Sequence, residues 1–237
     1  ERSKAQAPVT AASTGDQTLV IALAQAPVAL DPADHRNREA ETVIRNMFDG
    51  LVTRDTVSGV HLELAEAMNW LDDTTLAVQL RQGVKFHNGD DFSGEDVAYS
   101  LARVPLVKNS PGSFQIYTRG VTKVDIVDAQ TLRLTTRGVM PLLPIDLSQV
   151  AILPKRLGDA PATEDFNSLK NAIGTGPYRI TAYNPGDRAT LERFDGYFGE
   201  KPHWQRVNYR MIPNDSARTS ALLAGDVDLI EAVPTSD

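Results

Sequence analysis

The sequence of 237 residues contains no cysteine. This absence excludes a disulfide-stapled scaffold, a thiolate zinc site and a cysteine nucleophile. Long apolar runs are missing too, because the longest, such as Leu19–Ala24, fall far below the ~20 residues that a membrane-spanning helix needs. The formal net charge of −7 argues against a general nucleic-acid binder. With 41% hydrophobic residues, the chain is expected to be a soluble globular protein with a real core.

Motifs that mark enzymes are also absent. The sequence has no G-x-S-x-G, no phosphate-cradling G-x-x-x-x-G-K and no H-x-x-x-H pair among its four histidines. Gly174–Arg179 begins like a dinucleotide-binding fingerprint, but it ends in arginine and leads into a predicted strand. Acidic pairs such as Asp72-Asp73 lie at predicted turns. The sequence therefore predicts a binding protein that has no catalytic residues, no metal and no cofactor.

Both ends of the chain show an α/β pattern. Thr18–Ala24 is a continuous apolar run of strand length, which predicts a strand buried on both faces of a parallel sheet. Apolar residues recur at helical spacing over Ala40–Leu51, and Gly50 lies where a left-handed helix cap is expected. Near the other end, the helix Ser216–Ala224 lies between two short strands, which predicts a parallel βαβ unit.

The middle of the chain is rich in hairpin signals. Met68–Leu71 is predicted to pair with Leu76–Leu80, and Val121–Val127 with Thr131–Thr136. Between these hairpins, Ser93 and the aspartate three residues later resemble a capping box that opens a short helix. This change of pattern predicts that one domain is inserted into another.

The predicted organisation has three parts. Residues 1–15 form a flexible tail. Residues 16–48 and 168–237 form an α/β domain, and residues 49–167 form the inserted domain.

Three blocks of the sequence carry a family resemblance. The first is TLVIALAQAPVALDP from Thr18, followed by VIRNMFDGLVTRD. The second is LAEAMNWLDDTTLAVQLRQGVKFHNGDDFSGEDVAYS from Leu64. The third combines GTGPY from Gly174, LERF from Leu191 and AGDVD from Ala224. In order and spacing, these blocks resemble the extracytoplasmic solute-binding proteins of ABC importers, specifically the peptide, nickel and opine type called family 5.

Most residues of these blocks are expected to be structural. Trp70 and the run Leu80–Phe86 are expected to be core and hairpin residues. Gly174 and Gly176 are expected to permit unusual backbone angles where the chain re-enters the first domain.

The resemblance implies a mixed α/β fold, namely a periplasmic-binding-protein-like type II lobe with an inserted hairpin-rich subdomain. In this family the solute lies in a cleft between two lobes, and hinge closure presents the closed form to a membrane permease. Two loops would line one wall of that cleft. The implied ligand contacts are His35, Arg36, Asn37 and Arg38 in the first loop, and Ser113, Phe114, Gln115 and Tyr117 in the second.

Two arginines in this predicted wall favour a solute with an anionic group. Arginine forks match carboxylate and phosphate geometry, so Arg36 or Arg38 would read that group. The alternative is that both arginines are solvated at a helix start, a position where the helix dipole disfavours cations.

The resemblance predicts the periplasmic solute-binding component of an ABC importer, with a peptide or small-molecule solute, an inner-membrane ABC permease and no nucleic acid as partners. Family members are longer, so the chain is expected to be the N-terminal lobe alone, without a signal peptide or the C-terminal lobe. Weak or absent ligand binding and self-association through an exposed interlobe face would follow. Two alternatives from other classes remain, a scaffold or receptor-contact module and an enzyme that reuses the fold.

Overall fold

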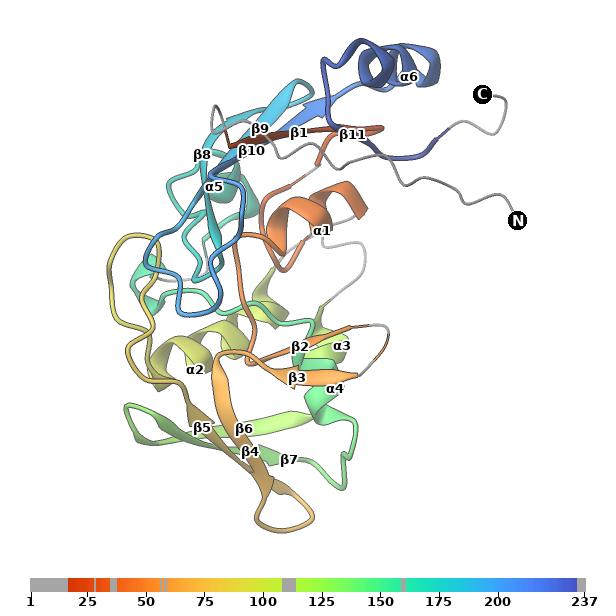
Figure 1. Cartoon of the computed structure of the whole chain (residues 1–237). Coiled ribbons are helices and arrows are strands. Elements are labelled where there is room, and N and C mark those ends of the chain that lie inside the picture. The colour runs from red at the N-terminus through yellow and green to blue at the C-terminus, as the bar shows by residue number, and fades with distance from the viewer. Residues whose placement is uncertain are drawn as a thin grey trace, which may run out of the picture.

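The computed structural model describes residues 17–27, 29–34, 38–55, 57, 59–107, 114–158 and 161–233. Within these residues, two sheet-containing parts lie one above the other (Figure 1). The upper part contains a five-stranded sheet in the order β11 (Leu229–Ile230), β1 (Thr18–Leu23), β10 (Arg206–Met211), β9 (Arg188–Arg193) and β8 (Tyr178–Asn184). The lower part contains a four-stranded sheet in the order β4 (Ala65–Trp70), β5 (Thr75–Leu80), β7 (Thr131–Thr136) and β6 (Val121–Asp128).

The upper sheet is mixed. β1 pairs in parallel with both β10 and β11, so the predicted βαβ unit exists but β1 lies between its two strands. β9 pairs antiparallel with both β10 and β8. The prediction that Thr18–Ala24 is buried on both faces is wrong for most of its length. Ala22 and Leu23 are buried, but residues 18–21 are half-buried, on both faces of the strand.

The lower sheet confirms both predicted hairpins. β4 pairs antiparallel with β5, and β6 pairs antiparallel with β7. Leu80, Val84 and Phe86 are buried as expected, but Trp70 is 38% exposed because it lies at the open end of β4. A separate small hairpin joins β2 (Val52–Arg54) to β3 (Val60–Leu62).

Helices cover the inner side of each sheet. α1 and α5 lie beneath the upper sheet, and α2 packs on the lower one (Figure 1). The helices are α1 (Arg38–Ile44), α2 (Gly94–Arg103), α3 (Gln115–Thr118), α4 (Leu143–Leu147), α5 (Thr163–Asn167) and α6 (Asp215–Ala224), with the 3-10 turns η1 (Val104–Leu106) and η2 (Lys155–Leu157).

The first helix is shorter than predicted. Apolar spacing predicted a helix to Leu51, but α1 ends at Ile44 and the chain then turns. Gly50 is not a left-handed cap. It forms a β-bridge with Ala151, where a Cβ atom would lie 3.0 Å from two carbonyl oxygens. The apolar residues after Ile44 are buried because they pass between two cores, and not because they lie on one helix face.

Two helix caps follow the local sequence. At α2, the Ser93 N–H donates to the Asp96 carboxylate at 2.8 Å, which confirms the predicted capping box. At α6, the Asn214 side chain accepts from the Ala217 N–H at 2.9 Å. Gly225 ends α6 with a left-handed φ of 79°.

Two hydrophobic clusters form the core. One contains Leu80, Val97 and Leu134 of the lower part, and the other contains Val43, Leu191 and Val207 of the upper part. Leu153 and Phe166 belong to the upper cluster although they lie inside the predicted insert of residues 49–167. The division into two domains at the predicted boundaries stays a prediction.

Candidate functional site

A buried ion pair fixes the Leu-Asp-Pro loop at the junction of the two cores. Arg103, the last residue of α2, donates from both terminal nitrogens to the Asp31 carboxylate at 3.0 and 2.5 Å. Both side chains are almost fully buried, and the guanidinium lies 4.8 Å from the centre of the Phe166 ring. Thr163 donates to the same carboxylate at 3.0 Å. The sequence identified Asp31 as a family marker but gave no signal of its partner.

Next to this ion pair, the segment that precedes His35 meets Phe114 of the second predicted contact loop. A cavity of about 10 Å³ is lined by Pro32 and Ala33 of the first loop and by Phe114 of the second. Phe114 is buried and packs edge-on against Tyr117, with ring centres 5.6 Å apart. The loop that follows Asp31 and the segment that starts at Phe114 therefore meet at one place on the molecule.

A larger cavity of about 80 Å³ lies beside the first and shares Pro32 with it. Its polar wall includes Arg45, Glu63 and Gln149. Arg45 forms an exposed ion pair with Glu41 at 2.7 Å. This cavity offers charges of both signs, and its volume suits a small polar group.

Glu63 of the larger cavity lies near a second acidic side chain, Asp49. Asp49 is buried and accepts a hydrogen bond from the Thr175 hydroxyl at 2.9 Å, and Glu63 accepts from the Gly50 N–H at 2.9 Å. Burial, reinforced by the nearby Glu63 carboxylate, raises the pKa of Asp49 to about 8. Burial also raises the pKa of Glu63. At neutral pH this site therefore keeps a proton that ordinary carboxyls have lost.

His87 connects the lower part to the GTGPY segment. Its Nε2 bonds to the Gly176 carbonyl at 3.0 Å and its Nδ1 to the Gly174 N–H at 3.3 Å. A neutral ring with the proton on Nε2 satisfies both contacts. Burial lowers the pKa of His87 to about 4, which agrees with that neutral form.

The two glycines of this segment do not have the predicted unusual angles. Neither has a positive φ. A Cβ on Gly174 would instead lie 2.0 Å from the Met47 carbonyl oxygen, and a Cβ on Gly176 would lie 2.6 Å from the carbon of the same carbonyl. Close backbone approach is therefore the reason for glycine, and the expectation was wrong about the cause.

The other predicted contact residues are dispersed. Arg38 is the exposed first residue of α1. Gln115, exposed at the start of α3, lines a separate pocket of about 440 Å³ between α2 and β6. The remaining four, His35, Arg36, Asn37 and Ser113, lie outside the described residues.

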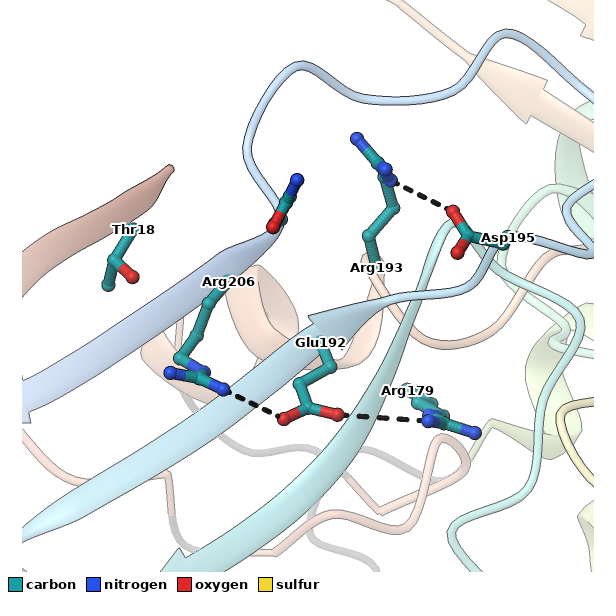
Figure 2. Close-up of a pocket in the computed structure, with 7 residues that line it drawn as sticks. Thr18, Arg179, Glu192, Arg193, Asp195 and Arg206 are labelled. Carbon is teal, nitrogen blue, oxygen red and sulfur yellow. Dashed lines mark hydrogen bonds and ion pairs between the residues drawn. The ribbon is translucent and has the colours of Figure 1, made fainter. Parts of the chain in front are cut away.

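A further pocket of about 400 Å³ lies at one end of the upper sheet (Figure 2) and shares no described lining residue with the two cavities above. Arg179, Arg193 and Arg206 line it, together with Glu192 and Asp195. None of the predicted ligand contacts within the described residues lines it.

Metal binding and membrane insertion find no support in the described part of the chain. Within it, no group of three or more His, Asp or Glu side chains could hold a metal ion. None of the helices there is long and apolar enough to cross a bilayer.

Comparison with protein families gives one match that covers most of the chain. The family model described as "Bacterial extracellular solute-binding proteins, family 5 Middle" matches residues 59–237. This match agrees with the resemblance found in the sequence blocks.

Individual relatives are longer than this chain. The oligopeptide-binding protein AppA of Bacillus subtilis is 32% identical over 213 residues, which are 84% of this chain and 38% of AppA. The glutathione-binding protein GsiB of Salmonella typhimurium is 27% identical over 221 residues, which are 91% of this chain and 42% of GsiB. The chain thus spans about two fifths of the length of these relatives, which are named as binding proteins and not as enzymes.

Solved structures confirm the predicted mixed α/β fold of the periplasmic-binding type. AppA from B. subtilis in complex with a nonapeptide superposes with a TM-score of 0.82 at 27% identity, and covers 93% of this chain and 44% of that chain. AgaA from A. tumefaciens R10 in complex with agropinic acid gives a TM-score of 0.81 at 28% identity, over 93% of this chain and 45% of that one.

Proposed function

The chain belongs to family 5 of the bacterial extracellular solute-binding proteins, and from this premise we propose that it forms one wall of a solute-binding cleft in an ABC importer. The observation that carries this proposal is the cavity shared by Pro32, Ala33 and Phe114. It joins the two loops to which the family resemblance assigns ligand contacts. The opposite wall would come from the part of the longer relatives that this chain does not match.

The proposed solute is a peptide or a similar small molecule with an anionic group. Relatives with solved structures are described as complexes with a nonapeptide and with agropinic acid, which makes these two chemistries reasonable first choices. Arg38 is exposed at the start of α1 and could bind a carboxylate through its planar fork. Arg36 would act in the same way. A periplasmic location and delivery to an inner-membrane permease are parts of the same proposal.

The proposed mechanism uses burial between two walls. A solute held on one wall alone gains part of the contacts that a closed cleft provides, so we expect weak binding to this chain. Closure of a second wall would remove water and satisfy the remaining polar groups of the solute.

The test is nuclear magnetic resonance of the isotope-labelled chain, because it detects binding in the millimolar range. Trialanine is titrated in two forms, with a free and with an amidated C-terminus. We expect amide shifts at residues 30–34, 114–117 and 148–151, with larger shifts from the free acid. Shifts that avoid these segments, or no saturable shifts at millimolar peptide, would overturn the proposal.

The anionic preference has its own control. Arg36→Ala and Arg38→Ala should each reduce the preference for the free acid, because each removes a guanidinium from the proposed wall. Arg54→Ala is the matched control, since Arg54 is exposed on β2 and belongs to neither of the two proposed contact loops. If all three variants retain the wild-type preference for the free acid, Arg36 and Arg38 do not bind the anionic group of the solute.

A further inference from the structure

The pocket at the end of the upper sheet concentrates positive charge on an acidic protein. Three guanidinium groups and two carboxylates line it, whereas the whole chain has a formal net charge of −7. Its volume of about 400 Å³ lies within the range of small-molecule sites. The charged side chains that line the pocket therefore have a net positive charge, opposite in sign to that of the whole chain.

The sheet register explains how two of the arginines come together. Arg206 on β10 lies opposite Glu192 on β9, and Glu192 lies opposite Arg179 on β8. All three side chains therefore project from the same, open face of the sheet. Glu192 binds Arg206 at 3.1 Å through one oxygen and Arg179 at 3.7 Å through the other (Figure 2).

This arrangement leaves the outer edges of both guanidinium groups available. The Arg179 and Arg206 side chains are 50% and 49% exposed. One shared carboxylate neutralises one of the two positive charges and holds both side chains in place. Each planar fork still has donors for another acid group.

The third arginine comes from the end of β9. Arg193 directly follows Glu192, so its side chain lies on the other face of the sheet, where it bonds to Asp195 at 3.2 Å and to the Pro202 carbonyl at 3.3 Å (Figure 2). It is the least exposed of the three, at 24%. These partners account for Arg193, so the inference rests on Arg179 and Arg206.

We propose that this pocket is a second binding site, for a small polyanion that carries at least two acid groups. One acid group would bind Arg179 and another Arg206, on either side of Glu192. Di- and tricarboxylates and oligophosphates share this chemistry. The site lies apart from the proposed cleft wall and does not depend on the proposed function.

The polyanion requirement follows from Glu192. A single carboxylate would have to compete with Glu192 for the same guanidinium edges. A molecule with several acid groups can bind the outer edges of both arginines at once, and the second contact is then intramolecular. Monoanions should therefore bind much more weakly than polyanions of similar size.

The experiment is isothermal titration of the full chain at constant ionic strength, with citrate, pyrophosphate and acetate as probes. We expect one saturable site for citrate or pyrophosphate, and affinity for acetate at least tenfold lower. The stronger of the two polyanions identifies the carboxylate or phosphate class. Lack of saturable binding by both would overturn the proposal.

Substitutions distinguish a specific binding site from general electrostatic attraction to the protein surface. Arg179→Gln and Arg206→Gln should each weaken polyanion binding about tenfold, whereas Glu192→Gln should strengthen it several-fold because the internal competitor loses its charge. Arg188→Gln is the matched control. Arg188 lies on β9, the strand of Glu192, forms an ion pair with Asp187 at 2.9 Å and does not line the pocket. Equal weakening by the control, or unchanged affinity in the Glu192 variant, would show that no such site exists.

Discussion

The buried carboxyl of Asp49 should make the protein less stable as the pH rises. This side chain is 3% exposed, and its pKa is raised to about 8 by burial and by the nearby Glu63. Asn is nearly isosteric with the protonated acid, and its carbonyl oxygen can still accept the hydrogen bond from Thr175. Asp49→Asn therefore removes the titration while it keeps the contact.

The sign follows from proton counts in the two states. Between the unfolded pKa of ~3.9 and the folded pKa, the folded protein holds this proton and the unfolded chain does not. The contribution of Asp49 to stability is therefore complete below the unfolded pKa and is lost as the pH rises through about 8. Within this interval, each pH unit lowers the free energy of unfolding by ~1.4 kcal/mol, which amounts to about 3 kcal/mol between pH 5 and pH 7.

Urea unfolding at several pH values, followed by tryptophan fluorescence, measures this slope. The Asp49→Asn variant should lose stability less steeply than the wild type between about pH 5 and pH 7, and should be the more stable protein at pH 7 and above. Asp73→Asn is the control, because Asp73 is exposed in the turn between β4 and β5. Parallel slopes for the wild type and the Asp49 variant would refute the reasoning.

At three further sites the structure predicts the direction in which a substitution or a pH change alters stability. Arg103→Met leaves a buried carboxylate unpaired and should cost about 3–5 kcal/mol in urea unfolding, whereas Lys155→Met, which removes an exposed ion pair, should cost less than about 1 kcal/mol. Gly174→Ala should lower the thermal midpoint because its Cβ would lie 2.0 Å from a carbonyl oxygen, and Gly138→Ala, which meets nothing within 4 Å, should not. The stabilising effect of neutral His87 should be complete above about pH 6.5 and fall by about 3 kcal/mol towards pH 4, and His87→Gln should flatten this slope in pH-dependent unfolding.

The parts of the fold that were predicted correctly have local signals. The hairpins β4–β5 and β6–β7 have alternating apolar residues on each side of a polar turn. The predicted helix Ser216–Ala224 is one residue shorter than α6, which begins after Asn214 and ends before Gly225, where both residues satisfy backbone groups within a few positions. In these places the interaction that fixes the structure lies within the sequence window that reveals it.

The predictions failed where distant segments decide the structure. Met47, Phe48 and Leu51 continue the apolar spacing of α1, but they are buried because the chain passes from one core to the other. Periodicity cannot distinguish these two reasons for burial. The same limit hid the pair Asp31–Arg103, whose members are 72 positions apart in the sequence.

The predicted ligand contacts stay a prediction, and several of them lie outside the described residues. Family resemblance pointed to the segment around Phe114 and to the loop after Asp31, and these two regions line one cavity. It did not point to Glu63 or Arg45, which line the neighbouring cavity from other elements. Nor did it indicate the pocket around Glu192, because that site depends on the register of three strands.

The contacts between the two cores predict that the described lobe moves as one body. The His87 N–H of the lower part donates to the Gly174 carbonyl at 2.8 Å, and the Gly174 N–H donates to His87 Nδ1 at 3.3 Å. Hydrogen exchange should therefore protect these two amides about as well as those of β9, since opening them requires the cores to separate. Fast exchange at His87 and Gly174 beside slow exchange in β9 would show that the cores move independently. If protection is uniform, the hinge motion of the proposed importer component must lie between this lobe and the opposite wall.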